Sequence, residues 1–140
     1  MAQFETTEKF GAKSKEMENL DYNIKDFDPE LHPIGIQQAQ SHQSVVNAIN
    51  WKIVFTSPMQ RNLMTTINMF KNHPNKATMK FVVIPVVREM LKFMNDVAMD
   101  IDVLVQKFAP GEAICEGIHF DFSACFVYGI PQLWQVYTLA

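Results

Sequence analysis

Hydrophobic residues in the middle of the chain form two short apolar runs with a stretch of helical periodicity between them. Residues 52–57 (KIVFTS) form a compact apolar run that ends at a Ser-Pro pair, as expected of a short strand. Apolar residues then recur at helical spacing, which predicts an amphipathic helix with a buried stripe of Leu63, Met64, Ile67 and Phe70. Residues 80–87 (KFVVIPVV) are apolar at successive positions, a pattern typical of a strand covered on both faces. Because proline cannot donate to a ladder, we expect Pro85 at the end of that strand or at an irregularity.

The order strand, helix, strand predicts a βαβ unit. A right-handed crossover makes its two strands parallel and packs helices on the sheet. We therefore expect an α/β fold of three layers, α/β/α, around a short and mostly parallel sheet. Only two strands are evident from the pattern, so the edges and faces of this sheet need cover from elsewhere.

Helical periodicity continues on both sides of this unit. A helix of about four turns is predicted over residues 35–49 by the apolar positions Ile36, Ala39, Val46 and Ile49. Residues 88–108 also carry apolar residues at helical spacing, with a candidate break at Asn95-Asp96 and an end at Pro110-Gly111.

The two ends of the chain differ from its middle. Residues 1–30 form a polar N-terminal segment, whereas residues 111–140 are aromatic and apolar with few charges. A tail of that kind is unusual on a monomer, so it either folds into the core or docks on a neighbouring chain. With 140 residues, 48% of them hydrophobic, we expect one globular domain over residues 1–140.

Charge and composition exclude several classes of function. The formal charge of −3 gives no general attraction for nucleic acid or for an anionic membrane surface. The longest apolar run, residues 81–87, is too short for a direct membrane span. Residues 1–21 show no secretory signal and only a poor case for a mitochondrial one. We expect an intracellular protein, with cytoplasmic, mitochondrial and cytoskeletal complexes all open.

The chain offers no metal site by spacing. Cys115 and Cys125 lack the paired spacing of zinc ligands, and we expect them to be reduced and structural. The four histidines are scattered. We interpret His32, His42 and His73 as solvated or capping residues, and His119, between Ile118 and Phe120, as a wall residue. No cofactor is expected.

Three stretches, in order, resemble the histidine phosphatase superfamily, the phosphoglycerate mutase-like proteins. They are DPELHPIGIQQAQ, VFTSPMQRNLMTT and VIPVVREML. The residues that match the motifs of that family are Asp28, Pro29, Leu31, Gly35, Gln38, Ala39, Ser57, Pro58, Arg61, Arg88 and Glu89. The resemblance implies a reduced version of the phosphoglycerate mutase-like fold and a phosphate pocket of which Ser57, Arg61, Arg88 and Glu89 are the remnants.

The resemblance also implies phosphoryl transfer through a histidine nucleophile, and no counterpart of that nucleophile is found in this chain. The family uses a histidine nucleophile in an Arg-His-Gly motif, but no Arg-His pair occurs here. Two alignments place Gln3 or Glu5 at that position. The second histidine of the family is replaced by Glu116 in one alignment of residues 111–140, and in the other the chain ends before it. No catalytic residue is therefore assigned.

Arg61 has two readings. It is either a surviving phosphate clamp just inside a helix, or an arginine paired with Glu89 or Asp28 after the pocket lost its purpose. We expect a catalytically inactive protein that acts as a structural or interaction subunit, with other protein subunits covering its incomplete sheet and aromatic tail. The alternatives are an active phosphatase or phosphomutase on small phosphorylated molecules, and a non-catalytic binder of a phosphate ligand.

Overall fold

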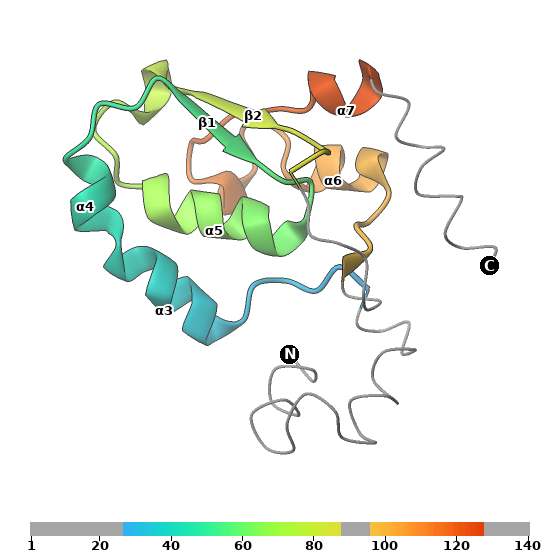
Figure 1. The fold of residues 1–140 in the computed structure, drawn as a ribbon, viewed down its shortest axis with the longest axis horizontal. Helices are drawn as coiled ribbons and strands as arrows, with labels where there is room; N and C mark the ends of the chain where they lie inside the picture. Colours follow the sequence, from blue (N-terminus) through green and yellow to red (C-terminus); the bar gives the residue numbers. More distant parts are fainter. Residues whose placement is uncertain (1–26, 88–95, 128–140) are drawn as a thin grey trace.

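A computed structural model describes residues 27–87 and 96–127, which fold around a small parallel sheet (Figure 1). Its strands are β1 (Ile53–Thr56), β2 (Lys80–Val83) and β3 (Phe120–Asp121), in the spatial order β1-β2-β3. Both pairings are parallel. The described chain is thus a small mixed α/β fold, as the pattern of strand, helix and strand predicted.

Helix α5 (Gln60–Phe70) makes the crossover between β1 and β2. Its stripe of Leu63, Ile67 and Phe70 is buried, because these positions recur on the side that faces the sheet. The ring of Phe70 packs edge-on against Phe81 of β2, with centroids 5.6 Å apart. The predicted βαβ unit is confirmed, and its helix covers one face of the two strands (Figure 1).

Two helices lie where one was predicted. α3 (Pro33–Ser41) and α4 (Gln43–Asn47) both pack on α5, and they are separated at His42. The single helix over 35–49 is therefore wrong in detail. The Ser41 hydroxyl donates to the carbonyl of Gln38 at 2.7 Å and the His42 ring lies 2.8 Å from the same oxygen. Such local side-chain bonds compete with helical backbone bonds and favour a break.

The second strand ends earlier than its apolar run. β2 stops at Val83, and residues 84–87 form a turn in which Val86 and Val87 are exposed. The predicted strand over 80–87 is wrong beyond Val83, because Pro85 cannot donate to the ladder. The 3₁₀ turn η2 (Lys76–Thr78) leads into this strand.

The predicted helix over 88–108 is much shorter within the described residues. α6 comprises Ile101–Lys107, and residues 97–100 are not helical. The carboxylate of Asp100 accepts from the backbone N–H of Asp102 and so starts the helix at that point. Residues 88–95 lie outside the described ranges.

Residues 111–127 contribute side chains to the core. For this part of the tail, the expectation that it folds into the core is confirmed. They form η4 (Ala113–Cys115), β3 and α7 (Ser123–Val127). The buried side chains among them are Cys115, Ile118, Phe120, Phe122 and Cys125. Phe120 contacts Phe81 and Phe108 edge-on, with both centroid distances at 6.2 Å. Residues 128–140 lie outside the described ranges, as do residues 1–26.

The two faces of the sheet differ. Side chains of Val54, Phe81 and Phe120 share the face that packs on α5, whereas Ile53, Phe55 and Val82 share the other. Ile53 is 45% exposed and Phe55 is 59% exposed. Within residues 27–87 and 96–127 no helix is long and apolar enough to cross a membrane.

Candidate functional site

The two described members of the predicted phosphate pocket lie at the carboxyl edge of the sheet. Ser57 directly follows β1, and Arg61 stands in the first turn of α5. In a parallel α/β fold this edge is the usual place for an anionic ligand. The other two members, Arg88 and Glu89, lie outside the described residues, so that half of the prediction is not tested.

A buried carboxylate occupies the start of α5. Asp28 is 0% exposed, and its Oδ1 accepts from the backbone N–H of Gln60 at 2.9 Å. Its Oδ2 accepts from the backbone N–H of Met99, also at 2.9 Å. The N-cap position of α5 is Met59, which has no polar side chain to do this work. A residue far away in sequence therefore supplies the negative charge that this helix end favours.

The backbone of Asp28 is held as firmly as its side chain. Its φ is 40°, a left-handed value that is uncommon for a residue other than glycine. The carbonyl of Asp28 accepts from Nε2 of Gln60 at 2.5 Å, and Oε1 of Gln60 accepts from Lys107 at 2.5 Å. Lys107 also forms an ion pair with the exposed Glu30. The cluster thus connects residues 28–30, α5 and α6.

Burial is the main influence on the acidity of Asp28. Removal from water raises the pKa of this carboxyl above its ordinary value, because the charged form is desolvated. The backbone N–H groups of Met99 and Gln60 and the charges of Arg61 and Lys107 act in the opposite direction and lower the pKa. The carboxylate is hydrogen-bonded at both oxygens, so it is compensated although it is buried.

Arg61 is part of an ion pair that the sequence did not predict. Its Nη2 lies 3.2 Å from Oδ1 of Asp96, which is buried. Asp96 lies at the predicted break, before α6, and its side chain is buried rather than solvated. A pairing of Arg61 with Glu89 stays a prediction. Asp28 acts on Arg61 at most through space, since its oxygens bond to backbone N–H groups.

Ser57 differs from Arg61 in its hydrogen bonding. Its side chain is 4% exposed, and its hydroxyl has no hydrogen-bond partner among the described residues. A buried hydroxyl without a partner costs free energy, so it is the polar atom of this edge that is left for a ligand or a water.

The histidines do not converge on this edge. His73 follows the end of α5, opposite the end that carries Arg61, and its ring bonds to the carbonyl of Ile49 and the N–H of Asn75. His119 directly precedes β3 and is exposed, so the wall position that its apolar neighbours suggested is wrong. His32 caps α3 by accepting from the N–H of Ile34. The predicted capping role is confirmed for His32, whereas His73 is buried and caps no described helix.

The two cysteines are free thiols in the core. Burial raises the pKa of both, and that of Cys125 to about 11, so neither is a thiolate at neutral pH. No group of three His, Cys, Asp or Glu side chains within the described ranges is arranged to hold a metal ion.

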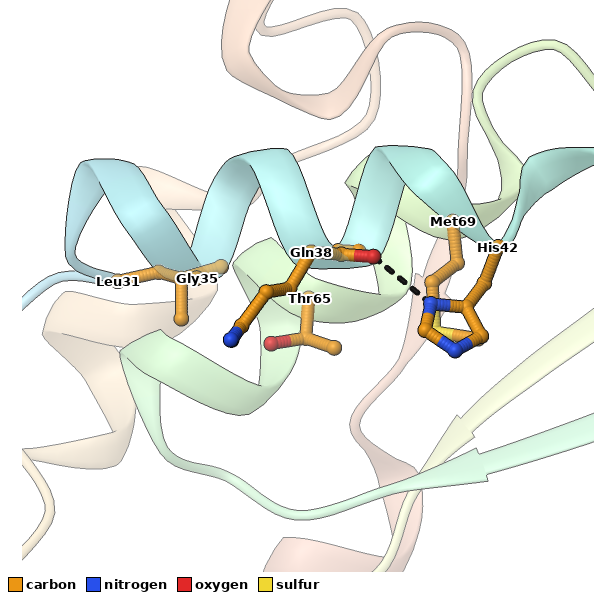
Figure 2. Close-up of a pocket in the computed structure, with 7 residues that line it drawn as sticks. Leu31, Gly35, Gln38, His42, Thr65 and Met69 are labelled. Carbon is orange, nitrogen blue, oxygen red and sulfur yellow. Dashed lines mark hydrogen bonds between the residues drawn. The ribbon is translucent and has the colours of Figure 1, made fainter.

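A shallow groove of about 290 Å³ lies between α3 and α5 (Figure 2). Its lining is mostly apolar and carries no formal charge: Leu31, Gly35, Gln38, Ala39, His42, Thr65 and Met69. A side chain at Gly35 would put its Cβ 2.7 Å from Leu31 Cδ1, so glycine leaves room at that end of the groove. Without a cationic group, this groove is not suited to a phosphate.

Comparison of the chain with protein-family models, with curated proteins and with solved structures finds no match.

The sequence placed Ser57 and Arg61 at this edge and named Asp28 only as a possible partner of Arg61, but it missed the role of Asp28 at the start of α5 and the pairing of Arg61 with Asp96. Asp28 and Asp96 are acids that approach from distant segments, and local periodicity carries no information about them. One signal was present for Asp28: a helix that begins at Pro58-Met59-Gln60 has no capping side chain of its own and needs an acceptor from elsewhere.

Proposed function

We propose that this chain is a catalytically inactive relative of the histidine phosphatases that serves as a structural or interaction subunit of a larger protein assembly. The observation that carries the proposal is the buried carboxylate of Asp28 at the start of α5. A phosphate placed there would meet a resident negative charge instead of free N–H groups.

The ion pair of Arg61 supports the same conclusion. A phosphate clamp presents its guanidinium to the ligand, whereas Arg61 already meets a buried carboxylate at 3.2 Å. Neither His73 nor His119 lies at this edge, and the ring of His32 is used as a helix cap. The chemistry expected of the family needs a neutral, oriented imidazole beside the phosphate.

The open face of the sheet supports the role in an assembly. Ile53 and Phe55 are large apolar side chains at neighbouring outward positions of one strand, and Val82 lies beside Phe55 in the paired register. Apolar positions that are grouped in this way are typical of a surface that another protein covers. In the three-layer arrangement that the βαβ pattern predicts, a second helical layer would lie on this face, and in our proposal partner subunits supply that cover.

Two measurements test the proposal. Purified chain is assayed with a generic aryl phosphate beside its Arg61→Ala variant, and we expect no turnover above the buffer rate from either. Turnover by the wild type that Arg61→Ala abolishes would overturn the proposal. The native particle that contains this chain is also sized, and we expect it to be several times larger than one 16.1 kDa chain.

A second candidate, a non-catalytic binder of a phosphate ligand, is favoured by one observation, the unpartnered hydroxyl of Ser57. Titration with inorganic phosphate, followed by the shift in midpoint of thermal unfolding, separates the two. A saturable stabilisation that Ser57→Ala removes would favour the binder. No shift is the result we expect.

A further inference from the structure

β1 is an edge strand, and the hydrogen bonds of the sheet define which of its groups are free. Lys80 N–H donates to the carbonyl of Lys52, and Ile84 N–H donates to the carbonyl of Thr56. In a parallel ladder the residues of a strand alternate between bonding to one side and to the other. Lys52, Val54 and Thr56 therefore bond to β2, and the N–H and C=O groups of Ile53 and Phe55 point away from the sheet.

These outward groups have no backbone partner among the described residues. They belong to a run, Ile53–Thr56, that contains no charge, no proline and no bulge. Natural sheets usually protect such an edge by charge, proline or cover, or they pair it with a further strand. The side chains of the same two residues are also exposed, so both the backbone and the open face of β1 are available to one extended segment.

We propose that residues 133–139 of the same chain, LWQVYTL, form a fourth strand that pairs with this edge of β1. The segment is uncharged, lacks glycine and proline, and is rich in the aromatic and β-branched residues that favour strands. The inference goes beyond the proposed function and does not depend on it. The added strand would also widen the open face that partner subunits cover.

The connection between α7 and this edge is long enough. α7 packs against β2, and the thiol of Cys125 lies 3.6 Å from the carbonyl of Val83, the last residue of that strand. A position outside β1 is two strand spacings from β2, about 10 Å. The intervening residues 128–132 number five and reach up to about 17 Å when extended. Gly129 and Pro131 in this linker suit a turn and interrupt any strand there.

The direction of the new strand follows from where α7 lies. In Figure 1, α7 stands at the end of the sheet to which the arrows of β1 and β2 point. A segment that starts there and runs beside β1 must run back along it, so the pairing is antiparallel. An antiparallel edge strand on an otherwise parallel sheet is a common arrangement.

Amide hydrogen exchange on the full chain tests the proposal residue by residue. We expect the amides of Ile53 and Phe55 to exchange at least about tenfold more slowly than in an unstructured chain, at every protein concentration. Val136→Pro removes a donor from the middle of the segment and should restore fast exchange at one or both positions. Gln132→Pro, in the linker, is the matched control and should leave the protection unchanged.

The amide of Val54 serves as the folding control, because it bonds to β2 and not to the free edge. Fast exchange of Ile53 and Phe55 in the wild type would overturn the proposal, and so would protection that survives Val136→Pro while Val54 stays protected. Protection that grows with protein concentration would assign the edge to a second copy. Protection that needs an added protein would assign it to a foreign strand. Either result rejects our assignment.

A second measurement needs no variant and decides the case in which Val136→Pro fails to fold. Contacts between Hα atoms of residues 53–56 and 133–139 are sought by nuclear Overhauser spectroscopy in labelled chain diluted with unlabelled chain. We expect intramolecular contacts of the antiparallel type. Their absence would overturn the proposal, and neither result depends on whether the protein has phosphatase activity.

Discussion

The carboxyl edge of the sheet and the open face of β1 differ in how far their side chains find partners within the protein. At the carboxyl edge, Asp28, Gln60 and Lys107 bond to one another or to backbone, and Arg61 has a carboxylate beside it. On β1, the large side chains of Ile53 and Phe55 stay in contact with water. Among the described residues, the polar groups of the region that a ligand was expected to enter already bond within the protein, with the hydroxyl of Ser57 as the exception. The region that remains open is apolar, which is a property of protein-binding surfaces.

The largest expected contrast is between two phenylalanines on opposite faces of the sheet. Phe81→Ala should lower the free energy of unfolding by about 3–5 kcal/mol, because it leaves a cavity in the core. Phe55→Ala should change it by less than about 1 kcal/mol, since that side chain is mostly exposed. Both are measured by urea unfolding at low protein concentration. Equal losses would mean that the open face is covered within the chain.

The closed edge is tested by removal of its central carboxylate. Asp28→Ala leaves the N–H groups of Gln60 and Met99 without acceptors, so we expect a loss of about 2–4 kcal/mol in the free energy of unfolding. Glu30→Ala is the matched control, because Glu30 is exposed and its ion pair should contribute at most about 0.5 kcal/mol. A loss no larger than that of the control would show that Asp28 is not the element that closes this edge.

The pH dependence of the free energy of unfolding also tests the role of Asp28. Because the pKa of Asp28 is higher in the folded state, the folded chain binds more protons than the unfolded chain at pH values between the ordinary value and the raised one. The contribution of Asp28 to the free energy of unfolding is therefore largest at pH values below its ordinary pKa. It falls as the pH rises from the ordinary pKa through the raised one. We expect the free energy of unfolding of the wild type, minus that of Asp28→Asn, to decrease as the pH rises. Urea unfolding from pH 3 to 7 measures this difference. A difference that grows with pH would contradict it.

The smallest effect is expected at Ser57. Its buried hydroxyl has no partner among the described residues, so Ser57→Ala should leave the free energy of unfolding within about 0.5 kcal/mol of the wild type or raise it slightly. Thr56→Val is a useful comparison, because the Thr56 hydroxyl accepts from Thr66 at 3.2 Å and its loss should be destabilising. A marked loss in Ser57→Ala would point to a bound water or ligand that holds the hydroxyl.

The local part of this fold could be predicted and the distant part could not. β1, α5 and β2 follow from two short apolar runs and the helical periodicity between them, within a stretch of some 30 positions, and Pro85 follows the end of β2 as expected. The break at His42 was missed, because it depends on two side chains that share one carbonyl. β3 is only two residues long, and pairing with β2 defines it more than its own propensity does.

The candidate site shows the same limit. Arg61 and Ser57 were placed correctly at the carboxyl edge, because both belong to the strand-turn-helix segment itself. Asp28 was expected only as a partner of Arg61. Its bonds to Gln60 and Met99 and the pairing of Arg61 with Asp96 were not predictable, since both acids reach this edge from segments on either side of the βαβ unit. Whether an arginine at a helix start holds a ligand or a carboxylate is decided by such distant residues.

The two hydrogen bonds of the Asp28 carboxylate also constrain how the protein can be made. One joins positions separated by 32 residues and the other joins positions separated by 71. As the chain emerges from a ribosome, Gln60 becomes available to Asp28 before Met99 does, so one oxygen of Asp28 stays hydrated until Met99 has emerged. The βαβ unit can therefore form before the hydrogen bond from Met99 to Asp28, which is added late in synthesis.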